Sequence, residues 1–164
     1  MFNNKPFFIV ISTILSILTM TTYAETKQSS TLEIAKTFLS AAGSGDGETL
    51  NKIMADDFVW YNEGDSKLPW IGQWKTKEVV FEKFMPKFGA GLKVTSWTTD
   101  FSFENGQYAV FMGTMSAIAT NTGVDTGKFS WAVRVHVVDG KVKSWHWFED
   151  SFAVSKAFHA KKKN

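Results

Sequence analysis

The second half of the chain constrains the fold most, because after Gly91 it consists of four strand-like runs separated by short turns. The runs are rich in β-branched and aromatic residues, and turn-forming pairs such as Asn105-Gly106 and Asp139-Gly140 lie between them. We predict strands over residues 92–103, 108–120, 127–138 and 141–154. Short turns of this kind join neighbouring antiparallel strands, so this half of the chain predicts an antiparallel meander.

The first half of the chain predicts three helices and one strand. Ser30 begins a Ser-x-x-Glu capping box, Asp46 can cap a second short helix, and Thr76 can cap a third helix that Pro86 ends. Alternating side chains over residues 58–62 predict the strand. Helices followed by a run of antiparallel strands are typical of an α+β domain with the helices on one side of the sheet.

Composition excludes several classes of protein. The chain has no cysteine, so a disulfide scaffold and thiolate chemistry are both excluded. A net charge of +2 gives no reason to expect a nucleic-acid partner. The 15 Phe, 7 Trp and 3 Tyr residues indicate instead a domain that is stabilised by burying aromatic rings.

The first 24 residues have the pattern of a secretory signal peptide. Lys5 supplies a positive charge, residues 6–20 are apolar, and small residues precede a cleavage site after Ala24. The apolar run is shorter than the roughly 20 residues that cross a bilayer, so we expect no stable membrane span after processing. The predicted location is periplasmic or secreted, and a leader retained as an anchor is the alternative.

Removal of this leader leaves a length suited to one domain. We predict a flexible N-terminus over residues 25–30, a single domain over residues 31–158 and a basic tail over residues 159–164.

The Asp139-Gly140 turn predicts which side chains share a face of the last hairpin. As a two-residue turn it places Val138 opposite Lys141, and unbroken pairing then gives every further partner. The predicted inner face holds Phe129, Trp131, Val133, Val135, Val137, Val142, Ser144, His146, Phe148 and Asp150. This register places two ionisable groups, His146 and Asp150, among apolar side chains.

The same register turns Trp145 and Trp147 toward the outer face, with Arg134 opposite Trp145. Two tryptophans on a polar face predict a contact patch, and we expect a sheet-to-sheet homodimer through it. Scattered exposed aromatic residues are the alternative.

Four segments of the chain, in this order, resemble the SnoaL-like branch of the nuclear transport factor 2-like superfamily. They are Gly45-Asp46 before a predicted helix, Asp56-Asp57-Phe58-Val59-Trp60, Leu68-Pro69-Trp70-Ile71-Gly72, and the run from Asp139-Gly140 through Trp145 and Phe148 to Asp150. The resemblance implies three helices packed on a strongly curved antiparallel sheet that forms a cone with an internal pocket. Members include polyketide cyclases, ketosteroid isomerases and epoxide hydrolases, so the fold alone does not set the reaction.

The resemblance also implies a role for particular residues. An acid near the end of the last strand is the general acid/base in the cyclase branch, and Asp150 stands at that position. Trp60 and Asn62 stand where the epoxide hydrolase branch has Tyr-x-Asn. That branch also needs an Arg-x-Asp pair that this chain lacks, which disfavours epoxide hydrolysis.

The sequence leaves three functions open. As an enzyme, the domain would use Asp150 for proton transfer and His146 to hydrogen-bond a developing oxyanion on a small, flat carbonyl compound. In the alternative, these two residues are structural, and the pocket binds a small hydrophobic molecule without chemistry. The predicted pocket walls are Trp60, Asn62, Trp70, Trp97, Phe129, Trp131 and Phe148.

The third possibility is an accessory domain that acts by dimerising. We expect neither a metal nor another cofactor, because His136 is placed outward and His159 lies near the tail, which leaves no convergent set of three ligands.

Overall fold

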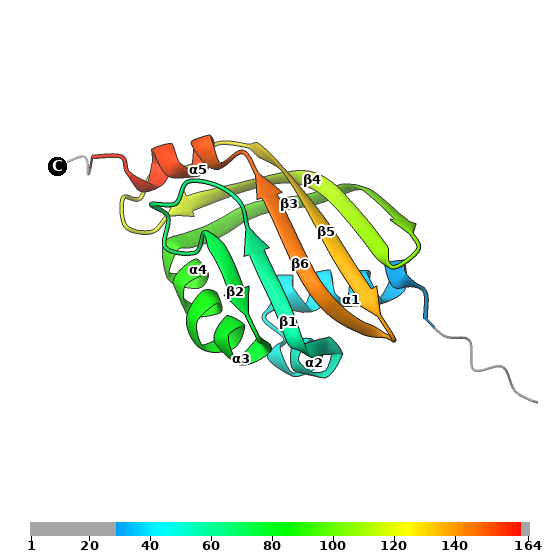
Figure 1. The fold of residues 1–164 in the computed structure, drawn as a ribbon. Coiled ribbons are helices and arrows are strands. Elements are labelled where there is room, and N and C mark those ends of the chain that lie inside the picture. The colour runs from blue at the N-terminus through cyan, green and yellow to red at the C-terminus, as the bar shows by residue number, and fades with distance from the viewer. Residues whose placement is uncertain (1–28, 162–164) are drawn as a thin grey trace, which may run out of the picture.

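The computed structural model describes residues 29–161, which form a six-stranded sheet with helices packed on one face (Figure 1). The helices are α1 (Thr31–Ser44), α2 (Gly47–Ile53), a continuous helix made of α3 (Lys77–Val79), the π-helical η1 (Val80–Phe84) and α4 (Met85–Gly91), and finally α5 (Ser151–Phe158). The strands are β1 (Met54–Asn62), β2 (Gly72–Lys75), β3 (Leu92–Asn105), β4 (Tyr108–Ala119), β5 (Phe129–Val138) and β6 (Lys141–Glu149). The predicted α+β class is confirmed. The predicted signal peptide and the end of the predicted basic tail lie outside the described residues.

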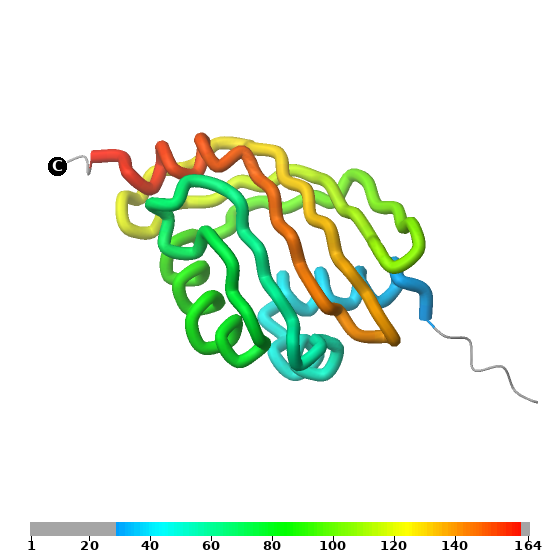
Figure 2. The backbone as a smooth tube through the Cα atoms, in the orientation of Figure 1, coloured from blue at the N-terminus to red at the C-terminus, as the bar shows by residue number. Residues whose placement is uncertain are grey.

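The sheet differs from the predicted one in two respects. Its order is β2-β1-β6-β5-β4-β3, and β1 pairs with β6 in parallel, so the sheet is not antiparallel throughout. The sequence predicted only neighbours joined by short turns, and these two strands lie far apart in the chain. The sheet is also not strongly curled, as the path of the backbone shows (Figure 2).

The helix starts follow the predicted caps. Ser30 accepts a hydrogen bond from the amide of Glu33, whose side chain accepts one from the amide of Ser30, and Asp46 accepts one from the amide of Thr49. The predicted stop at Pro86 is wrong. The π-helical turn η1 ends at Phe84, and the helix continues through Pro86 in the first turn of α4.

A fourth helix, α5, replaces the end of the predicted last strand. Strand β6 ends at Glu149, and Asp150 is the N-cap residue of α5. Val154 and Ala157 are buried three residues apart, so one face of this short helix packs on the domain.

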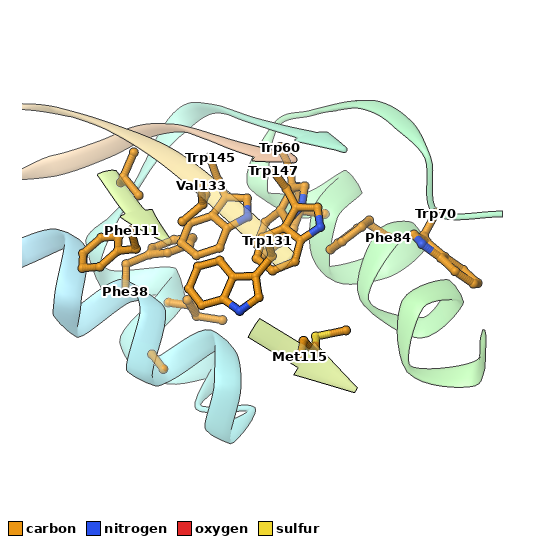
Figure 3. Packing of buried hydrophobic residues seen from close by; sticks show 14 of the residues in the cluster. Phe38, Trp60, Trp70, Phe84, Phe111, Met115, Trp131, Val133, Trp145 and Trp147 are labelled. Atoms are coloured by element: carbon orange, nitrogen blue, oxygen red, sulfur yellow. The ribbon is translucent and has the colours of Figure 1, made fainter. Parts of the chain in front are cut away.

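The core is a cluster of aromatic rings between α1 and the sheet (Figure 3). Phe38 of α1 is fully buried, and its ring lies 5.6 Å from Phe58 and 5.2 Å from Trp145, measured between centroids. Tilted ring pairs at these distances contribute beyond the area that they bury. Helix α1 is also tied to the β3–β4 hairpin, because the Leu32 amide donates to the Glu104 carboxylate.

One extra residue in β6 changes the register of the last hairpin. Val138 opposes Lys141 and Val137 opposes Val142, as predicted, but His136 opposes Ser144. Lys143 is therefore the extra residue that pairs with no residue of β5, and it forms a β-bulge. Beyond it every side chain of β6 lies on the opposite face from the predicted one.

Burial of the tryptophans explains why the bulge is stable. Trp145 and Trp147 are 2% and 5% exposed, whereas unbroken pairing would place both rings in water. Burying one such ring contributes about 4–6 kcal/mol, which outweighs one lost pairing between strands.

Candidate functional site

A cavity of about 570 Å³ lies between the helices and the inner face of the sheet. Its size is within the usual range for cavities that hold small molecules. It is lined by Lys36, Leu39, Ser40, Ala42, Gly43, Trp60, Asn62, Phe84, Met85, Phe88, Val94, Trp97, Thr99, Trp145 and Trp147. Helices α1 and α4 with η1 supply one side, and strands β1, β3 and β6 supply the other.

Four tryptophans give this cavity flat walls. The rings of Trp145 and Trp147 are stacked at 6.3 Å with only 6° between their planes, and Trp97 stacks on Trp147 at 5.6 Å. Trp60 lies 4.5 Å from Phe84 of η1, between ring centroids. Aromatic side chains held against one another in this way shape the cavity for a planar, apolar molecule.

Few polar side chains reach the cavity. Asn62 is the only buried polar residue among the described residues, and its Oδ1 accepts a hydrogen bond of 2.7 Å from the indole nitrogen of Trp60. Ser40, Thr99 and the exposed Lys36 complete the polar lining.

Glu149 is a half-buried acid on the inner face, and one of its carboxyl oxygens is fully buried. It opposes Trp131 at the end of β6, and its Oε2 accepts a 2.8 Å hydrogen bond from the indole nitrogen of Trp147. Its other oxygen, Oε1, is buried and has no partner among the described residues. Burial raises the pKa of Glu149 to about 7, against the lowering effect of the Trp147 hydrogen bond, and the nearby Asp150 raises it further.

Glu149 is one side chain removed from the cavity, because Trp147 lines the cavity and Glu149 does not. The carboxyl therefore holds the wall in place and can exchange a proton near neutral pH, but it does not itself face the empty space.

The two residues predicted to carry catalysis lie on the outer face. The bulge turns His146 outward, where its Nδ1 lies 3.1 Å from Nη2 of Arg134 and its Nε2 lies 2.8 Å from Oε1 of Glu63. Asp150 is exposed at the start of α5. The predicted placement of both residues among inner apolar side chains is wrong, because the prediction assumed unbroken pairing beyond Val142.

The structure divides the predicted wall residues. Trp60, Asn62 and Trp97 line the cavity, and Trp131 lies directly behind, 4.3 Å from Trp97 between ring centroids. Trp70 and Phe129 are buried away from it. Phe148 is 40% exposed on the outer face, so its predicted inward position is wrong. Whether any of them contacts a ligand stays a prediction.

The predicted dimer patch is also wrong in its residues, because Trp145 and Trp147 are buried in the core. The exposed aromatic side chains near this face are others, with Phe101 and Phe103 of β3 67% and 51% exposed. A homodimer stays a prediction, without the tryptophans that suggested it.

Residues 29–161 contain no cluster of three or more His, Asp or Glu side chains that could hold a metal ion. None of the helices in this part of the chain combines the length and the apolar character needed to cross a bilayer.

Sequence reasoning missed Lys36 and Glu149 for different reasons. Lys36 precedes Ser40 by four residues and Gly43 by seven, so the helical repeat already placed them on one face. Glu149 could be found only through the bulge. The signal for it was the spacing of Val142, Trp145 and Trp147, whose apolar alternation slips by one residue at Lys143-Ser144.

Comparisons with known proteins agree with this architecture. A search of solved structures matches a nuclear transport factor 2-like protein from Burkholderia xenovorans (TM-score 0.70, 20% identity, 79% of this chain and 95% of that one). It also matches a Mesorhizobium loti protein described as a SnoaL-like polyketide cyclase (TM-score 0.58, 20% identity, 73% and 99%). A third match is TerC co-crystallised with polyporic acid (TM-score 0.66, 18% identity, 79% and 98%).

Identities this low show a shared fold and not a shared reaction. A comparison with proteins of curated function finds no match. The model of the SnoaL-like domain, in contrast, matches residues 35–145, which is more than half of the chain. The chain therefore belongs to the SnoaL-like family.

Proposed function

We propose that this chain binds a small, flat, largely apolar molecule in the cavity between α1, α4 and the inner face of the sheet. The observation that carries the proposal is the set of four tryptophans around a space of about 570 Å³ with few polar groups. Planar rings give a large contact area at little cost in side-chain entropy, which suits capture of a planar ligand. The co-crystal of the structural relative TerC with polyporic acid supports ligand binding by this fold.

The predicted signal peptide adds a location to this proposal. The mature domain would act in the periplasm or outside the cell, where it would carry or sense its ligand. Absence of cysteine suits such an oxidising compartment as well as any other.

Acid/base chemistry of the isomerase or cyclase type is a second candidate, and Glu149 is the observation that favours it. Its pKa of about 7 suits proton exchange at neutral pH, and Oε1 has no partner among the described residues. Glu149 does not line the cavity, whereas its hydrogen-bond partner Trp147 does, so proton transfer to a carbonyl ligand would need a movement of side chains or a bridging water molecule. Binding without chemistry is therefore the better supported function.

The test uses two exposed aromatic side chains of β3 as a matched pair. Trp97 is 41% exposed and lines the cavity, whereas Phe101 is 67% exposed and does not. With anthraquinone as probe and tryptophan fluorescence as readout, we expect saturable quenching that Trp97→Ala weakens about three- to tenfold and Phe101→Ala leaves unchanged.

Native mass spectrometry of the protein purified from cell envelopes would identify a natural ligand by its mass. Quenching that never saturates, or equal effects of both substitutions, would count against binding in this cavity.

A further inference from the structure

We infer that the ligand of this cavity is an organic anion with an apolar, planar body, an oxygen acceptor for the buried Asn62 and an acidic group for the exposed Lys36. The inference rests on the proposed function, because it concerns the same cavity. It follows from which hydrogen-bonding atoms the cavity offers and which it has already used.

The buried lining residue Asn62 offers a hydrogen-bond donor. An indole N–H can only donate, so the Asn62 atom that lies 2.7 Å from the Trp60 nitrogen must be the amide oxygen. This fixes the orientation of the amide and leaves Nδ2 with its two hydrogens, for which no described residue provides an acceptor. Because Asn62 is 4% exposed, a ligand that displaces water there must bring a carbonyl or similar oxygen or leave the donor unpaired at a cost.

The exposed lining residue Lys36 offers a positive charge. Lys36 is the only charged residue in the described lining, and it forms no ion pair with another described residue. Glu33, three residues earlier in α1, is already engaged, because its carboxylate accepts a hydrogen bond of 2.9 Å from the amide of Ser30. A carboxylate on the ligand could form an ion pair with Lys36.

The remaining polar side chains of the lining carry no negative charge that would repel an anion. Ser40 and Thr99 carry hydroxyls that can donate as well as accept, and no carboxylate is present in the described lining. A cationic ligand would meet Lys36 with like charge, and a ligand rich in donors would face two donors at Asn62 and Lys36. An acid with an apolar ring system and a keto or quinone oxygen matches both Lys36 and Asn62.

Three related probes separate the contribution of Lys36 from that of Asn62. They are anthraquinone-2-carboxylate, its neutral amide anthraquinone-2-carboxamide, and anthracene-2-carboxylate, which lacks the ring oxygens. By tryptophan quenching we expect the quinone carboxylate to bind about fivefold more tightly than the amide, as for a partly exposed ion pair, and about fivefold more tightly than anthracene-2-carboxylate. Added salt should weaken binding of the carboxylate and leave the amide unchanged.

Substitution of Lys36 tests the charge directly. Lys36→Met keeps the apolar stem and should abolish the difference between carboxylate and amide. Lys156→Met removes an exposed lysine of α5 outside the cavity and should leave the difference intact.

The outcomes distinguish the two proposals. Equal binding of carboxylate and amide by the unmodified protein, or a difference that survives Lys36→Met, would overturn the anionic ligand and leave the cavity as a binding site. Saturable quenching by none of the three probes would overturn both.

Discussion

Replacing Glu149 by Gln should change the way in which stability depends on pH. The folded protein raises the pKa of this carboxyl from 4.5 to about 7, chiefly by burying it. Between these two values the folded state holds a proton that the unfolded state has released. Stability must therefore fall as the pH rises from about 4.5 to 7, and it changes no further above that range on account of this group.

The size of the effect follows from the two pKa values. Each pH unit between 4.5 and about 7 costs about 1.4 kcal/mol, so the loss amounts to roughly 3 kcal/mol. Glutamine keeps the shape and can still accept the Trp147 hydrogen bond through its amide oxygen, but it has no charge to bury. The stability of Glu149→Gln relative to the unmodified protein should thus increase by roughly 3 kcal/mol between pH 4.5 and pH 7.5.

Urea unfolding at four or more pH values measures this difference directly. Subtraction of the two curves removes the contributions of the histidines and the exposed acids, which both proteins share. Glu82→Gln, which removes an exposed carboxyl of η1, is the control and should give a difference that is flat with pH. A flat difference for Glu149→Gln as well would refute the buried, protonated carboxyl and with it the bulged register.

Two further predictions concern packing. Gly91→Ala should destabilise by about 1–3 kcal/mol, because an added Cβ would lie 2.1 Å from the ring of Trp70, whereas Gly89→Ala in the same helix meets no atom within 4 Å and should be neutral or stabilising by up to about 1 kcal/mol. Equal thermal melting of these two variants would contradict the close approach of Gly91 to Trp70. Trp147→Ala should cost about 3–5 kcal/mol in urea unfolding, as expected for a ring in the core. If sedimentation instead showed a well-folded variant that had only lost a partner copy, the buried position of Trp147 would be wrong.

The sequence predicted best those features that depend on neighbouring residues. The cap at Ser30 needs only Glu33 three positions later, and the cap at Asp46 needs only the amide of Thr49. Turn chemistry was equally local, so the pairing of Val138 with Lys141 is confirmed. The parallel contact of β1 with β6 could not be predicted in this way, because nothing near either strand records which distant strand will lie beside it.

The register of β5 and β6 beyond their turn is set by two competing effects, the geometry of the turn and the burial of apolar side chains. A two-residue turn fixes pairing only while both strands continue without an insertion, and the prediction extended it to Asp150. Burial of Trp145 and Trp147 decided otherwise, because two indole rings gain more from the core than a regular ladder gains from one more pair. The apolar pattern of a strand should therefore be weighed again after every polar pair such as Lys143-Ser144.

The bulge also decides which of two neighbouring acids is buried. Glu149 and Asp150 are adjacent, so a strand that presents one of them inward must present the other outward or end. With Lys143 inserted, Glu149 opposes Trp131 and has a pKa of about 7. Asp150 is exposed to solvent as the N-cap residue of α5. The resemblance to the cyclase branch implied an acid near the end of the last strand and matched it to Asp150. The cavity lies on the inner face of the sheet, and Glu149, not Asp150, is on that face. Any test of proton transfer in this chain should therefore begin with Glu149.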